Sequence, residues 1–289
     1  MAAEFPVRGD AALVLEGGGM RGQYASGVLD WLLQAGIRFP YVIGVSAGIS
    51  NAASYVAGQF GRNRQIFTTF AADPRYFSWR NWWREGNPFG MDFIYRELPA
   101  HIPFDFAAFA AASGRFRIGA TDCATGRAVF FDKPDAPLGE ALRASASLPL
   151  VGRMARVNGK LCLDGGIAAP IPFRQAAADG HPRPVVVLTR NRGFRKVPPG
   201  AAVRAAIRWK YRRFPALAAA VARQPETYNR ALDELEAEEA AGRALVIRPT
   251  QPLAVGRYSQ DRAELERLYQ NGYADARAGA DQLRGFLSP

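Results

Sequence analysis

The sequence predicts an α/β fold with a mainly parallel central sheet. Short apolar runs have the length and composition of buried strands, and stretches with apolar residues at helical spacing follow them. Glycine-rich loops join each strand to the next helix. Because this strand–loop–helix order occurs twice in succession, we expect parallel strands covered by helices.

The first sixty residues contain both units of this order. Residues 11–16 form an apolar run, and a helix over residues 23–34 ends at Gly36. Residues 41–45 form the second apolar run, and a helix is expected over residues 47–59. These segments define the start of the predicted domain.

The middle of the chain is less regular. Residues 67–116 are rich in aromatic side chains and are divided by Pro74, Pro88, Pro99 and Pro103. Beyond this aromatic segment the sequence predicts strands over residues 115–121, 127–132, 160–163 and 184–189, and a helix over residues 138–146. The run at 184–189 is the clearest strand in the chain.

Beyond Pro198-Pro199-Gly200 the composition shifts to Ala, Arg and Glu. Helices are predicted over residues 203–214, 217–241 and 262–283, with a break permitted at Pro225, and a strand over residues 244–247. We therefore expect an N-terminal tail (1–10), an α/β domain (11–198) and a mainly helical C-terminal extension (199–289) packed on the same domain.

Composition narrows the class of protein. Hydrophobic residues make up 48% and charged residues 22% of the 289 residues, as in a globular domain. Residues 1–10 lack the apolar run of a signal peptide, and no apolar run is long enough for a transmembrane helix. The two cysteines, Cys123 and Cys162, suit a reducing compartment, so we expect a cytoplasmic protein.

The net charge of +11 favours anionic partners such as phospholipid surfaces or nucleic acid. Residues 190–213 hold nine Lys or Arg residues and no acid, which suits either a solvated basic face or an anion-attracting patch. Within it, Arg204, Arg208 and Arg212 form a stripe beside the apolar face of the predicted helix. We hypothesise that this stripe attracts anionic lipid headgroups.

The pentapeptide Gly44-Val45-Ser46-Ala47-Gly48 matches G-x-S-x-G between a predicted strand and a predicted helix. In that setting a sharp turn exposes the serine oxygen, and Gly44 and Gly48 leave room for the backbone. Ser46 is therefore a candidate nucleophile. The alternative is a chance loop or a helix-capping serine.

A glycine loop, Gly17-Gly18-Gly19-Met20-Arg21-Gly22, also lies between a predicted strand and a predicted helix. Its backbone N–H groups, with the charge of Arg21 nearby, could hold a developing oxyanion. Gly17, Gly19 and Gly22 also match the dinucleotide pattern G-x-G-x-x-G. That interpretation requires an acid at the end of the second strand, where Ser46 stands instead.

Asp164-Gly165-Gly166 follows the predicted strand at 160–163. The ends of parallel strands gather at one edge of a sheet, so we expect Asp164 near Ser46, where its carboxylate could accept the serine proton. Asp-Gly is also a common turn dipeptide, which is the alternative.

Only two histidines could complete a triad. His101 lies in the aromatic segment, and His181 precedes the strand at 184–189, at the edge of a parallel sheet opposite the strand-to-helix loops. A triad through His181 is therefore unfavourable, and a Ser–Asp dyad remains.

The three motifs, in this order, resemble the patatin-like phospholipase family, as does Ala144-Ser145-Ala146-Ser147-Leu148-Pro149 ahead of the aspartate. The resemblance implies a three-layer α/β/α sandwich and a lipid or phospholipid substrate, with no metal and no cofactor. Carried over, Ser46 is the nucleophile, Asp164 the general base and the loop from Gly17 to Gly22, with Arg21, the oxyanion hole. Gly166 stands where many members have Ala. Segments 189–196 and 255–257 resemble a bacterial branch whose members are mostly uncharacterised.

Trp79, Trp82 and Trp83 alternate with arginines in the aromatic segment, which suits a membrane interface or the mouth of an acyl pocket. Ordinary core packing is the alternative. No nucleic-acid-binding module is recognisable, so no nucleic-acid partner is expected. Two other functions stay open: a non-catalytic basic lipid-binding protein on the same fold, and a histidine-dependent esterase.

Overall fold

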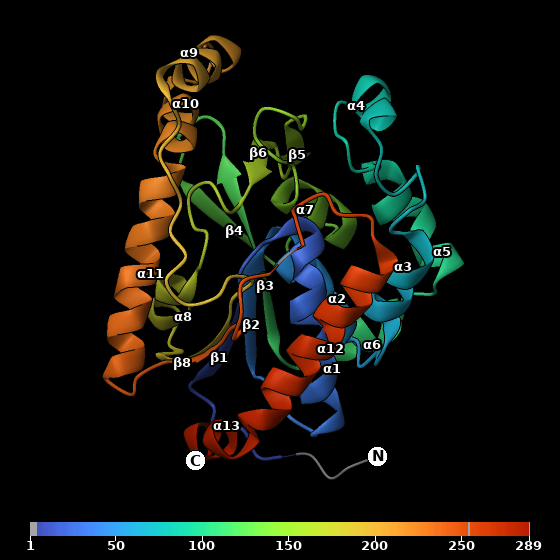
Figure 1. Ribbon diagram of the computed structural model, residues 1–289, viewed down its shortest axis with the longest axis vertical. Helices are drawn as coiled ribbons and strands as arrows, with labels where there is room; N and C mark the ends of the chain where they lie inside the picture. Colours follow the sequence, from blue (N-terminus) through green and yellow to red (C-terminus); the bar gives the residue numbers. More distant parts are fainter. Residues whose placement is uncertain (1–4, 254, 289) are drawn as a thin grey trace.

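A mixed sheet of eight strands forms the centre of the computed structural model, which describes residues 5–253 and 255–288 (Figure 1). The strand order is β5-β6-β3-β2-β1-β7-β8, and β4 pairs with β3. The strands are β1 (Ala11–Leu15), β2 (Tyr41–Val45), β3 (Arg115–Asp122), β4 (Ala128–Asp132), β5 (Ala155–Val157), β6 (Lys160–Asp164), β7 (Arg183–Val187) and β8 (Leu245–Ile247). All strands expected from the sequence are present, and the short β5 was not expected.

The five strands from β3 to β8 in this order are parallel, as the sequence predicted. Every residue of β1 and β2 is buried, because helices cover both faces of the sheet. One face carries α1 (Gly22–Gln34), α2 (Ser46–Val56), α3 (Arg62–Phe70) and α12 (Arg262–Ala278). The other carries α8 (Phe173–Ala178) and α11 (Gln224–Ala240), so the predicted three-layer α/β/α sandwich is confirmed (Figure 1).

Strand β6 corrects the expectation that parallel strand ends bring Asp164 to Ser46. It runs antiparallel to β3 and pairs Asp164 with Ala120. Strands β2 and β4 both pair with residues 117–119 of β3, so they lie on its opposite edges. Strands β4 and β6 both pair with Ala120 and Thr121, so β6 lies on the same edge of β3 as β2 and follows directly after the end of β2. The ends of β2 and β6 therefore approach each other from opposite directions.

The C-terminal extension is integrated into this fold. Its strand β8 pairs with β7, and α12 packs closely on α1, where a Cβ on Gly27 would lie 2.0 Å from the carbonyl oxygen of Tyr269. The remaining helices of the extension are α9 (Ala201–Lys210), α10 (Pro215–Ala222) and α13 (Ala280–Leu287). The expected break near Pro225 is confirmed, whereas the helix expected over residues 203–214 ends at Lys210 and the one over 262–283 is divided at Gly279.

The aromatic segment folds into the short helices α4 (Trp79–Glu85), the π-helix η2 (Phe93–Glu97), α5 (Leu98–His101) and α6 (Phe106–Ala111), and α7 (Leu138–Ser145) follows β4. Of these, η2 and α5 pack beside α3, and α6 packs beside α2. Phe67, Tyr76 and Phe89 are buried among them. By contrast, Trp79, Trp82 and Trp83 are 57%, 40% and 80% exposed on α4, so core packing does not account for these three. No helix among the described residues is long and apolar enough to cross a membrane.

Candidate active site

Ser46 stands at the turn between β2 and α2. Its φ of +54° lies in the left-handed region, which a serine adopts only under strain, while Val45 before it is extended. Ser46 is the first residue of α2 and is 7% exposed. This is the geometry of a nucleophile elbow, in which the backbone turns sharply so that the serine side chain leaves the sheet.

Ser145, at the end of α7, holds this turn from the side. Its Oγ donates a hydrogen bond of 2.6 Å to the carbonyl oxygen of Gly119 and accepts one of 2.8 Å from the backbone N–H of Ser46. Ser145 is fully buried. No motif in the sequence assigns a role to Ser145, and the Ala/Ser-rich stretch around it is the signal that points to this position.

Asp164 ends β6 beside this turn. Its Oδ1 accepts a hydrogen bond of 2.7 Å from the backbone N–H of Gly166, and its backbone N–H donates one of 2.8 Å to the carbonyl oxygen of Ser147. Burial raises the pKa of Asp164 above its ordinary value, against the influence of hydrogen bonding by the Ser46 hydroxyl, which lowers it. A carboxylate of raised pKa beside a serine hydroxyl is suited to accept a proton.

Three glycines permit the close approach of β1, β2 and α2 at this point. A Cβ on Gly17 would lie 2.8 Å from the Cβ of Ser46, and one on Gly48 would lie 2.3 Å from the carbonyl oxygen of Glu16. A Cβ on Gly44 would lie 2.9 Å from the carbonyl oxygen of Leu15. Larger side chains at these positions would displace the turn, which accounts for the glycines of two sequence motifs.

The glycine loop leads from β1 into the 3₁₀ turn η1 (Gly19–Arg21). Its Met20 N–H donates a hydrogen bond of 3.1 Å to the carbonyl oxygen of Arg257, so the C-terminal extension fixes one end of the loop. Gly17, Gly18 and Gly19 line the cavity at Ser46. Arg21 and Gly22 do not line it: Arg21 is buried, and Gly22 faces Asn51 of α2, whose Nδ2 donates a hydrogen bond to the carbonyl oxygen of Gly22.

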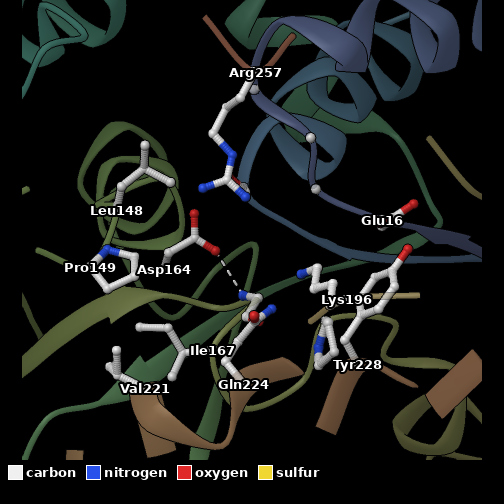
Figure 2. Close-up of a pocket in the computed structure, with 16 residues that line it drawn as sticks. Glu16, Leu148, Pro149, Asp164, Ile167, Lys196, Val221, Gln224, Tyr228 and Arg257 are labelled. Carbon is white, nitrogen blue, oxygen red and sulfur yellow. Dashed lines mark hydrogen bonds between the residues drawn. The ribbon is translucent and has the colours of Figure 1, made fainter. Parts of the chain in front are cut away.

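Ser46 lies where two cavities meet. On one side, a polar cavity contains Asp164, Glu16, Lys196 and Arg257, and Figure 2 shows the last two pointing into it from different segments of the chain. The other cavity is mainly apolar and lies between α2 and the aromatic segment. Its wall is formed by Gly19, Met20, Ser46, Ala47, Ser50, Asn51, Phe67, Tyr76, Phe89, Met91, Ile94, Tyr95, Ala146 and Leu148. Lys196 and Arg257 were not predicted as site residues, because a basic run and an isolated arginine do not indicate which cations turn inward.

The histidines lie away from this junction. The ring of His181 stacks on Tyr41 at 4.4 Å between centroids, and Tyr41 begins β2, whereas Ser46 follows its end. His101 is exposed and lies beside Phe70 and Phe93. Among the described residues, no group of three His, Cys, Asp or Glu side chains could hold a metal ion.

The basic run is divided between several environments. Arg192 and Arg195 form salt bridges with acids of α11, Lys196 enters the polar cavity, and Arg204 and Arg208 are exposed on α9. Two apolar side chains of the same helix, Val203 and Trp209, are 45% and 73% exposed. Helices α4 and α9 both project at the end of the molecule opposite the chain termini (Figure 1).

Comparison with known proteins identifies two regions of the chain. Residues 13–177, more than half of the chain, match the family model described as patatin-like phospholipase, and residues 214–288 match a domain of unknown function (DUF6363). The chain is 31% identical over 186 residues to the uncharacterized protein YjjU of Escherichia coli (strain K12). That match covers 63% of this chain and only 52% of the relative. The crystal structure of VipD from Legionella pneumophila superposes with a TM-score of 0.48 and 13% identity, over 95% of this chain and 67% of that one.

Proposed function

Because the chain belongs to the patatin-like phospholipase family, we propose that it is a serine acyl hydrolase that cleaves carboxylic esters of lipids or phospholipids through Ser46 and Asp164. The observation that carries the proposal is that Ser46, in a strained elbow, shares one cavity with the buried Asp164 and with Gly17, Gly18 and Gly19. A nucleophile, a base and backbone donors are the three parts that acyl transfer requires.

In the first half of the reaction, Ser46 Oγ attacks the ester carbonyl carbon while Asp164 accepts the hydroxyl proton. The negative charge that develops on the carbonyl oxygen is held by the backbone N–H groups of Gly18 and Gly19, which donate no hydrogen bond to any described residue. The tetrahedral intermediate then expels the alcohol, which takes the proton from Asp164. An acyl-enzyme on Ser46 remains.

In the second half, Asp164 takes a proton from water, and the resulting hydroxide equivalent attacks the acyl carbon. Ser46 leaves with that proton, and the fatty acid is released. Burial assists Asp164 in both halves, because a raised pKa brings the carboxyl closer to the pKa of an ideal base at neutral pH.

The mainly apolar cavity next to Ser46 supports an acyl chain as the part of the substrate that lies on this side. Phe67, Phe89 and Met91 give it an apolar wall, and Ala47 and Met20 bring it to the nucleophile. Burial of a hydrocarbon chain there contributes roughly 0.8 kcal/mol for each methylene removed from water.

The exposed tryptophans and arginines on α4 and α9 support peripheral contact with an anionic membrane, where such a hydrolase would meet its lipid substrate. A cytoplasmic location, with transient attachment to that membrane, is part of the same proposal. Partners other than the lipid surface are not required.

Hydrolysis of dihexanoylglycerol by four proteins tests this proposal: the unaltered chain, Ser46→Ala, Asp164→Asn and His181→Ala. A Ser–Asp dyad predicts loss of turnover in the first two variants and near-normal turnover in His181→Ala. Loss of turnover in His181→Ala as well as in Ser46→Ala would favour the histidine-dependent esterase. Full turnover by Ser46→Ala would exclude the proposed nucleophile.

A further inference from the structure

The polar cavity beside Ser46 contains two cations whose charge the protein does not neutralise directly. Neighbouring Arg192, Arg195 and Arg248 form salt bridges with acids of α11, whereas neither Lys196 nor Arg257 forms a salt bridge with a described residue. Both nevertheless line the cavity and point into it (Figure 2). Both are half-buried, and withdrawing an unpaired cation from water is unfavourable, so such side chains in a cavity suggest an anionic ligand.

Lys196 is held in place by α11 along its whole length. Its backbone N–H donates to Asn229 Oδ1 at 2.8 Å, and its carbonyl oxygen accepts from Asn229 Nδ2 at 2.9 Å. Its Nζ lies 4.0 Å from the centre of the Tyr228 ring. Burial lowers the pKa of Lys196 to about 8, and an anion in the cavity would reverse part of that shift.

Arg257 approaches from the opposite side, on the segment between β8 and α12. Its carbonyl oxygen accepts the hydrogen bond from Met20 N–H, so its backbone is tied to the glycine loop. Its guanidinium extends above Asp164 (Figure 2). It lowers the pKa of Asp164 by charge, which offsets part of the effect of burial.

The two acids of the cavity hydrogen-bond to other groups of the protein and form no salt bridge with Lys196 or Arg257 among the described residues. Glu16 accepts hydrogen bonds from the backbone N–H and the hydroxyl of Thr189, at 2.6 and 3.1 Å, and Asp164 accepts from Gly166. Burial, together with the charges of Arg190 and Arg257, lowers the pKa of the nearby Arg21. Two cations and two acids therefore line the cavity, and the positive charges of Arg21 and Arg190 add to those of the cations, because Arg21 interacts with both Arg190 and Arg257.

An ester places its acyl chain and its alcohol on opposite sides of the carbonyl carbon. If the acyl chain lies in the mainly apolar cavity, the alcohol lies in the polar one, which shares Ser46, Gly19 and Leu148 with it. We propose that Lys196 and Arg257 bind the phosphate of this alcohol, so that the enzyme selects phosphate-bearing lipids over neutral glycerides. The inference rests on the proposed acyl hydrolase function.

Two substrates with the same acyl esters test the inference: dihexanoylphosphatidic acid and dihexanoylglycerol. The measured quantity is the ratio of kcat/KM for the first over the second. Lys196→Met and Arg257→Met should each lower this ratio about tenfold or more, because each substitution removes a charge-assisted hydrogen bond to the phosphate. Lys196→Arg should restore most of it. Arg230→Met removes an exposed cation from the same helix as Tyr228 and should leave the ratio unchanged.

An unchanged ratio in both Lys196→Met and Arg257→Met would overturn the inference. Equal loss on the two substrates would also overturn it, because it would mean that the cations act on Asp164 rather than on the substrate. A shift of the acid limb of the pH–rate profile in these variants would show such an effect on Asp164.

A binding measurement separates failure of the inference from failure of the proposed function. The Ser46→Ala protein is titrated with dihexanoylphosphatidic acid and with inorganic phosphate, with and without Lys196→Met. If Lys196→Met weakens binding of the lipid about tenfold, the headgroup subsite is supported even if the chain hydrolyses neither ester. Binding of inorganic phosphate without binding of the lipid would overturn the headgroup assignment, as would binding of neither.

Discussion

The hydroxyl of Ser145 accepts a hydrogen bond of 2.8 Å from the backbone N–H of Ser46 and donates one of 2.6 Å to the carbonyl oxygen of Gly119. The bond joins the end of α7 to the strained residue at the start of α2. Two residues further, the carbonyl oxygen of Ser147 accepts the backbone N–H of Asp164. One short segment therefore positions the backbones of both proposed catalytic residues.

Ser145→Ala should reduce reactivity at Ser46 without unfolding the protein. Loss of the acceptor leaves a buried N–H unsatisfied at a strained residue, which costs about 1–3 kcal/mol. We expect a lower melting temperature and a fluorophosphonate labelling rate reduced about tenfold. Ser147→Ala is the matched control, because Ser147 Oγ donates only to the carbonyl oxygen of Arg143. Equal effects of the two substitutions would contradict a positioning role for Ser145.

The pH–rate profile should reflect the raised pKa of Asp164. The carboxyl can accept a proton only when ionised, so kcat/KM falls as the pH drops through its pKa. Since burial raises that pKa, the fall should begin well above the ordinary aspartate value of about 3.9. An acid limb at or below that value would contradict the assignment of Asp164 as base.

The same shift has a consequence for stability. A carboxyl whose pKa is higher in the folded than in the unfolded state favours folding when protonated, and that contribution is lost as the pH rises above the unfolded value. At neutral pH the ionised Asp164 therefore destabilises the fold. We expect Asp164→Asn to raise the melting temperature at pH 7 while abolishing turnover. A lower melting temperature in this variant would show that its hydrogen bonds outweigh the charge burial.

Gly17→Ala should abolish turnover, because the new Cβ would lie 2.8 Å from the Cβ of Ser46 and push the elbow away from the glycine loop. Gly200→Ala is its control, since nothing lies within 4 Å of a Cβ there and its φ of −64° suits alanine. The measurement is turnover of dihexanoylglycerol with circular dichroism of each variant. Normal turnover by Gly17→Ala would mean that Ser46 has more freedom than its burial indicates.

Binding to anionic vesicles should depend on both projecting helices. The Arg204/Arg208/Arg212 triple alanine variant removes positive charge near α9, and Trp82→Ala with Trp83→Ala removes exposed aromatic area from α4. Each set should weaken sedimentation with phosphatidylglycerol vesicles, the first more at low salt than at high salt. Unchanged binding by the arginine variant would refute the hypothesis that this stripe attracts headgroups.

The parallel core was predictable because each strand is a short apolar run and each loop after it contains the glycines that its geometry requires. The placement of Asp164 was predicted for the wrong reason: β6 is antiparallel, and only the pairing of β3 with three strands explains its meeting with Ser46. The inward turn of Lys196 depends on contacts with Asn229 and Tyr228, which lie 33 and 32 residues further along the chain, and periodicity and motifs do not encode such contacts.

The end of the predicted helix at Phe214 was also misplaced. Tyr211 is buried, and its hydroxyl accepts the backbone N–H of Leu150, so tertiary contact rather than helix propensity shapes the chain there. As a result, Arg212 lies beyond α9, in the turn that follows it.

Covalent labelling determines whether Ser46 is the nucleophile. The full chain is treated with a fluorophosphonate probe, and the modified peptide is identified by mass spectrometry. We expect one probe adduct on Ser46 in the unaltered protein, slower labelling in Asp164→Asn and none in Ser46→Ala. Labelling of Ser46→Ala at the rate of the unaltered protein would show that Ser46 is not the nucleophile.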